Sequence, residues 1–163
     1  MKSRLLFAVL LTVAVMMIAS VAFAASPAEQ VATPFKGTIQ AAETNVVQFP
    51  TLYVDATGSG NATHLGRYTV SYQAVVYIPT LAGVDAAHFI AANGDSIFAE
   101  GLGQASDSGI PNVFKIVEKY TITGGTGRFD GATGSFIVER LLNTTANVTS
   151  GSFDGSIVLP RGK

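Results

Sequence analysis

The sequence predicts one all-β domain, an eight-stranded antiparallel meander or barrel, behind an N-terminal export signal. Eight segments have the alternation of apolar and polar residues that is typical of strands, and clusters of glycine, asparagine and proline separate them. No window shows a sustained 3.6-residue apolar period with caps, so we expect little helix. Eight strands at this spacing favour a meander or barrel over a βαβ fold.

The first 24 residues have the pattern of a signal peptide. Lys2 and Arg4 precede an apolar run over 5–19, and the small-x-small sequence at 22–24 predicts cleavage before Ala25. An uncleaved membrane anchor is the alternative, because the run is nearly long enough to span a bilayer. No cysteine is available for a lipid anchor. We therefore expect an exported protein, periplasmic or secreted, with no stable membrane insertion after cleavage.

The composition indicates which partners the protein can bind and how its fold is stabilised. Removing 24 of the 163 residues leaves 139, with 8 basic and 11 acidic side chains, so nothing suggests a nucleic-acid partner. An exported chain without cysteine has no disulfide, and apolar burial with closed hydrogen bonding must stabilise it. A barrel supplies both, since closing a sheet removes its unpaired edges. We expect a linker at 25–33 and the barrel domain at 34–163.

The first half of the domain reads as three strands. Pro34–Glu43 is the first, and Val46–Gly58 is the second, with a bend expected at Pro50 because proline removes a ladder donor. A glycine-rich loop is expected at Gly58–Gly66. Arg67–Ile78 is the clearest strand, with its tyrosines and aliphatic residues on one face and polar residues on the other.

The second half supplies five more strands. Asn93-Gly94 divides 86–105 into two extended runs and is a strong hairpin signal. Val113–Thr123 and Gly134–Asn143 flank the glycine-rich stretch at 121–135, and Thr149–Pro160 is the eighth strand.

The stretch TITGGTGRFDGATGS at 121–135 predicts a hairpin turn. Four glycines, at 124, 125, 127 and 131, give its backbone access to positive φ. Phe129 is the only large apolar side chain in the polar part, and we expect it to plug one end of the core. Neither a P-loop nor a dinucleotide fingerprint fits, because no lysine follows and the next segment reads as a strand. We expect no cofactor.

The segment GGTGRFDGATG resembles the glycine-rich turn of the allene oxide cyclase and dirigent superfamily, and most of all its small secreted bacterial members. The order of strands extends the likeness over most of the mature chain. The resemblance implies an eight-stranded antiparallel barrel whose lumen holds a hydrophobic ligand. It implies no catalytic residue, because the matching motif is a turn.

Glu118 is the candidate catalytic residue. Lys115 and Lys119 mark one face of its strand as solvent-facing, so Glu118 falls on the inner, apolar face. Burial would raise the pKa of its carboxyl, as a general acid or base near neutral pH requires. Two structural interpretations stay open: Glu118 pairs with Arg140 across the lumen, or it lies at the wet mouth of the barrel.

Five further residues are candidates for ligand binding. Glu100 would form an acidic pair with Glu118 if both pointed inward, but the pattern of its strand does not decide its direction. The hydroxyls of lumen-facing tyrosines would offer hydrogen bonds, unless these are core aromatics with satisfied hydroxyls. The five candidates are Glu100, Tyr68, Tyr72, Tyr120 and Arg140.

Motifs for metal or nucleophilic chemistry are missing. His64 and His88 are far apart in sequence and have no second ligand at zinc spacing, so we expect no metal site. No GxSxG and no cysteine nucleophile occurs.

Three functions remain open: a barrel that binds a hydrophobic small molecule in its lumen, a cofactor-independent cyclase or isomerase that uses Glu118, and a structural or protein-interaction barrel with a filled lumen. An eight-stranded barrel is just wide enough for its own side chains or one small ligand.

Overall fold

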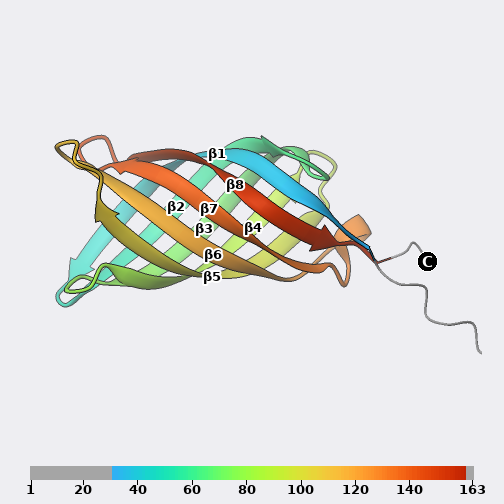
Figure 1. Cartoon of the computed structure of the whole chain (residues 1–163), viewed down its shortest axis with the longest axis horizontal. Coiled ribbons are helices and arrows are strands. Elements are labelled where there is room, and N and C mark those ends of the chain that lie inside the picture. Colours follow the sequence, from blue (N-terminus) through green and yellow to red (C-terminus); the bar gives the residue numbers. More distant parts are fainter. Residues whose placement is uncertain (1–30, 161–163) are drawn as a thin grey trace, which may run out of the picture.

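Eight antiparallel strands close into a barrel in the computed structural model, which describes residues 31–160 (Figure 1). The predicted all-β, eight-stranded fold is thereby confirmed, whereas the predicted signal peptide lies outside the described residues. The strands are β1 (Ala32–Gln48), β2 (Thr51–Ala62), β3 (Gly66–Tyr77), β4 (Ala82–Ala91), β5 (Ser96–Asp107), β6 (Val113–Gly125), β7 (Thr133–Asn143) and β8 (Val148–Val158), with one short 3-10 helix, η1 (Gly127–Phe129).

Each strand pairs with its neighbours in the chain, and β8 closes the ring by pairing with β1 from Ala32↔Val158 to Ala42↔Val148. No strand edge is left unpaired around the barrel, although the β5–β6 ladder has a register shift between Phe98 and Ala99. The short helix η1 is the only helix in residues 31–160, and no helix in that part of the chain is long and apolar enough to cross a membrane. β1 begins at Ala32, inside the predicted linker.

Two of the differences from the predicted strand boundaries have a direct physical cause. Pro50 does not bend a strand; with Phe49 it forms the turn between β1 and β2, where Gln48 pairs with Thr51. Proline loses no ladder bond at a turn. The expected loop at 58–66 is strand as far as Ala62, because small residues are needed there: a side chain at Gly60 would collide with the Thr38 carbonyl and the Tyr68 ring.

Aromatic side chains fill one half of the lumen. Phe136 packs edge-on against Phe35, with ring centroids 5.2 Å apart, and stacks on Tyr120 at 5.0 Å. Phe89 and Phe153 join this cluster, and all five rings are buried. Aromatic rings are large and bury much apolar area, so this half of the lumen is the main hydrophobic core.

The glycine-rich turn closes the same end of the barrel. η1 inserts Phe129, which has no exposed surface, so its predicted role as a plug is confirmed. Gly124, Gly127 and Gly131 have positive φ of 150°, 57° and 77°. Gly125 does not; a side chain there would instead collide with the Ser96 carbonyl and come within 2.6 Å of Phe129 Cβ. The prediction of positive φ is thus wrong for this one glycine, which is required by close packing.

The two ends of the barrel therefore differ. The plugged end carries η1 and the β2–β3 and β4–β5 turns, together with the start of β1 and the end of β8 (Figure 1). The opposite end carries the β1–β2, β3–β4, β5–β6 and β7–β8 turns and has no plug (Figure 1).

Candidate lumen site

A cavity of about 290 Å³ occupies the unplugged half of the lumen. Polar groups from β1, β4, β6 and β7 lie at its base, toward the aromatic core. Most of the wall residues are aliphatic or aromatic, and Asn45, Gln104 and Thr144 are polar exceptions. The apolar wall residues are Val47, Leu52, Val54, Ala74, Val76, Ile78, Leu81, Ala105, Phe114, Ile116 and Leu142.

A buried ion network lies at the cavity base. Arg140 binds Glu118 with two hydrogen bonds, Nε to Oε2 at 2.9 Å and Nη2 to Oε1 at 2.7 Å. Its Nη1 donates to Glu43 Oε1 at 2.6 Å and to Thr149 Oγ1 at 3.1 Å. Burial disfavours the guanidinium charge, but hydrogen bonding and charge from Glu118 outweigh it and raise the pKa of Arg140. Arg140 is therefore a permanent cation held by two carboxylates.

The tyrosines of the lumen are protonated hydrogen-bond donors. Burial raises the pKa of Tyr72, and its hydroxyl donates to Glu43 Oε1 at 2.7 Å. Burial also raises the pKa of Tyr120, with the charges of Glu118 and Asp85 adding to the rise. Tyr68 lies in the aromatic core, where burial raises its pKa and its hydroxyl donates to the Thr38 carbonyl at 2.7 Å.

Asp85 is the one acid at the base that no cation holds. The residue is 8% exposed, it lines the cavity, and its Oδ1 has no hydrogen-bond partner. Burial raises the pKa of Asp85 to about 7, and the charge of Glu118 adds to the rise, whereas Tyr120 and Arg140 oppose it. A buried carboxyl oxygen without a donor is unfavourable, and such groups often mark functional sites.

Two glycines of β5 make room for the acids. A side chain at Gly101 would collide with Asp85 Oδ1 and come within 2.8 Å of the Tyr120 ring. A side chain at Gly103 would lie 2.9 Å from Glu118 Cγ. β5 therefore faces the lumen with its smallest residues.

Glu100 lies on the outside of the barrel and not in the lumen, where it was a candidate for ligand binding. Its pairing partners on the neighbouring strands are Ala86 and Thr121, and all three are exposed on the outside of the barrel. The acidic pair of Glu100 and Glu118, which required both side chains to point inward, therefore does not form. The error has a physical cause: Ala99, Gly101 and Gly103 are inside because the large lumen side chains come from other strands.

The structure places the other predicted residues as follows. Glu118 and Arg140 form the buried pair that was one interpretation of the sequence, and Tyr72 and Tyr120 border it. Tyr68 lies in the aromatic core instead.

Glu43, Asp85 and Thr149 join the base without having been predicted there. Glu43 continues the alternation of Phe35 and Ile39, which would have placed it inside. Asp85 was not considered, because this strand was expected to begin at Ala86, whereas β4 begins at Ala82.

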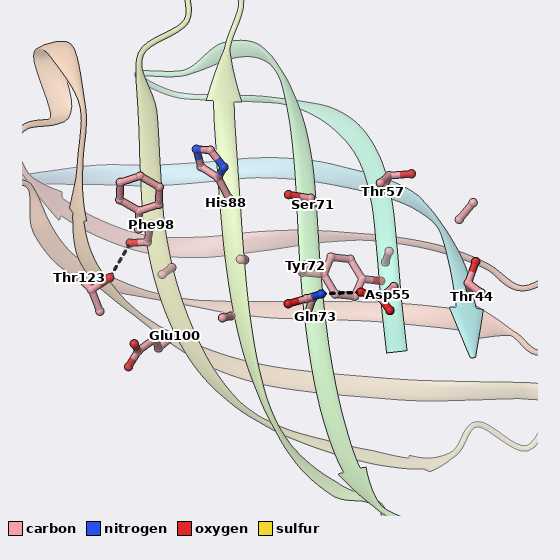
Figure 2. Close-up of a pocket in the computed structure, with 15 residues that line it drawn as sticks. Thr44, Asp55, Thr57, Ser71, Tyr72, Gln73, His88, Phe98, Glu100 and Thr123 are labelled. Carbon is pink, nitrogen blue, oxygen red and sulfur yellow. Dashed lines mark hydrogen bonds between the residues drawn. The ribbon is translucent and has the colours of Figure 1, made fainter. Parts of the chain in front are cut away.

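A second hollow lies on the outer surface of β1 to β5. Figure 2 shows Thr57, Ser71, His88 and Phe98 in a row across four strands, with the Gln73 amide donating to Asp55 at 2.7 Å in a second row. The His88 ring packs on Phe98 at 4.7 Å, and its Nε2 has no partner. The hollow is open to solvent, and most of its polar side chains are exposed.

The histidines are separate from the lumen site. His64 Nε2 lies 3.1 Å from Thr33 Oγ1 and 3.2 Å from the Pro34 carbonyl, at the plugged end. Within residues 31–160, no three His, Cys, Asp or Glu side chains are grouped so that they could hold a metal ion.

Comparisons of this chain with protein-family models, curated proteins and solved structures find no match.

Proposed function

We propose that this protein is an exported barrel that binds a hydrophobic small molecule in the unplugged half of its lumen. The observation that carries the proposal is the cavity of about 290 Å³, with apolar walls and a small number of polar groups gathered at its base. Apolar walls with a few convergent polar groups are typical of small-molecule sites. The signal-like pattern at 1–24 supports export.

The size of the cavity limits the ligand. About ten water-sized groups would fill it, given a share of ~30 Å³ for each water in the liquid. A chain of eight carbons with one polar head group has this size. The filled-lumen alternative describes only the plugged half, where Phe35, Phe136 and Phe153 occupy the space.

The turn sequence GGTGRFDGATG and the eight-stranded meander support grouping this chain with the allene oxide cyclase and dirigent barrels. Under that grouping the lumen steers an apolar molecule without a cofactor.

Calorimetric titration with 1-octanol tests the binding function. We expect saturable binding at one site, and at least tenfold weaker binding to Ala74→Phe, whose ring would fill the cavity from β3. Val75→Phe is the matched control, because Val75 is the next residue on β3 and faces outward. Thermal melts establish that both variants fold. If octanol and its eight-carbon analogues all fail to bind the wild type, the proposal is wrong.

A second candidate function is cofactor-independent isomerisation by proton transfer. Glu118 is held by two hydrogen bonds to Arg140, so Asp85 is the better candidate for the base, with one oxygen unpaired and a pKa of about 7. Exchange of the α-hydrogens of 2-octanone in D₂O tests it. The carboxylate would take the proton from carbon, and a deuteron would return to that carbon. We expect exchange faster than in buffer, and its loss in Asp85→Asn; equal rates would exclude this chemistry for ketones.

A further inference from the structure

We propose that the ligand is a hydrophobic amine, bound with its ammonium group against Asp85 at the base of the cavity. This inference rests on the proposed function and specifies the chemical class of its ligand.

The charge at the cavity base is the first observation. Three carboxylates, Glu43, Asp85 and Glu118, line the cavity with one guanidinium, Arg140. Every other lysine and arginine in residues 31–160 is exposed on the outside of the barrel. The base therefore has more negative than positive charge, and a cation entering the cavity is attracted to it.

The second observation is the position of the uncompensated acid. Arg140 makes four hydrogen bonds, two to Glu118 and one each to Glu43 and Thr149, and none to Asp85. Asp85 Oδ1 is buried without a donor, although the carboxyl lines the cavity. The ion pairs of Arg140 are with Glu43 and Glu118, so a ligand that brings a positively charged donor to the Asp85 carboxyl gains an interaction that Arg140 does not supply.

The third observation is the fit around the head group. An ammonium group supplies up to three N–H donors and one positive charge in a compact shape. Above Asp85 the walls are apolar, from Val54 and Ala74 to Val76 and Ile116, and would bury an alkyl chain. A carboxylate head group would instead meet Asp85 and Glu118 with like charge, which is strongly unfavourable at low dielectric. An alcohol would supply one donor without the charge.

Three ligands of equal chain length separate these possibilities by calorimetry at pH 8: octylamine, 1-octanol and sodium octanoate. We expect octylamine to bind at least tenfold more tightly than octanol, and octanoate not to bind measurably. Octanol or octanoate binding as tightly as octylamine would overturn the amine inference and leave the hydrophobic site intact. The absence of saturable binding by all three would overturn the site itself.

Asp85→Asn tests the residue. The amide has nearly the same shape without the charge, so we expect octylamine affinity to fall at least tenfold and octanol affinity to change less than threefold. Glu100→Gln is the matched control, because it removes a carboxylate from the outside of β5, and octylamine affinity should be unchanged. Equal octylamine affinity for Asp85→Asn and wild type would overturn the assignment to Asp85. The ligand series on the wild-type protein remains decisive if the variant does not fold.

Discussion

Replacing Asp85 by asparagine is expected to stabilise the empty barrel, and increasingly so as the pH rises from 4 to 7. The carboxyl lies in the low-dielectric lumen, where burial raises its pKa to about 7 from an ordinary value of 3.8. Between these two values the folded protein holds a proton that the unfolded chain has released. The free energy of unfolding of the wild type therefore falls across this window and levels off above about pH 7.

The size of the effect follows from the displacement of the pKa. Moving the pKa of Asp85 from 3.8 to about 7 corresponds to about 4 kcal/mol. Water entering the open cavity would reduce this figure, so we expect the variant to exceed the wild type by about 2–4 kcal/mol at pH 8. At pH 4 the difference should be near zero, because the folded wild type is then neutral at Asp85.

The charged and titratable groups that face Asp85 are the same in both proteins, so the difference between their curves isolates this carboxyl. They are Glu118 and Tyr120 on β6 and Arg140 on β7, which act on its pKa, and Glu43 on β1, which lines the same cavity, while its pairing partner on β5 is Gly101.

Urea unfolding at pH 4, 5.5, 7 and 8 measures both free energies by linear extrapolation. Asp154→Asn is the control, because Asp154 is exposed on β8, where it pairs with Lys36 at 2.7 Å. Its effect should stay below about 1 kcal/mol at every pH. A constant difference between Asp85→Asn and wild type from pH 4 to 8 would refute the reasoning, since a buried carboxyl with a raised pKa cannot give one.

Three further substitutions test the packing and the ion network. Arg140→Met leaves Glu43 and Glu118 buried without their cation, and should lower the free energy of unfolding by about 3–5 kcal/mol at pH 7; a urea midpoint equal to that of the wild type would contradict the network. Phe129→Ala removes the plug and should destabilise the protein by about 3–5 kcal/mol, measured in the same way; a change below 1 kcal/mol would mean that the plug is dispensable. Gly125→Val forces a side chain against Phe129 and should lower stability by about 1–3 kcal/mol, seen as a fall in melting temperature; an unchanged melt would remove the packing role of this glycine.

The fold could be predicted because its signals are local. Alternation along β3 and β6 separates inside from outside residue by residue, and the Asn93-Gly94 turn fixes one hairpin. The boundary errors arose at Pro50, which was expected to bend a strand, and at Gly60, which was placed in a glycine-rich loop. Their actual roles depend on neighbouring strands: Pro50 lies in a tight turn, and Gly60 makes room for Tyr68.

The site was only partly predictable, because the pattern of apolar residues reveals the inward face of some strands and not of others. Glu118 and Arg140 follow from alternation on adjacent strands whose other inward residues are large and apolar. On β5 the inward residues that follow Ile97 are alanine and glycine, so apolar content misleads, and Glu100 has no local feature that marks it as outward. Asp85 was missed because its position depends on three strands. It lies between Ala74 on β3 and Gly101 on β5, and Gly101 leaves the space that its carboxyl occupies. No single segment of sequence contains this relation.

The most direct test of the lumen site is a crystal structure of the protein grown with octylamine. We predict the alkyl chain between Val76 and Ile116, with its nitrogen within about 3 Å of a carboxylate oxygen of Asp85. A cavity that contains only water, or an amine bound outside the barrel, would contradict the account.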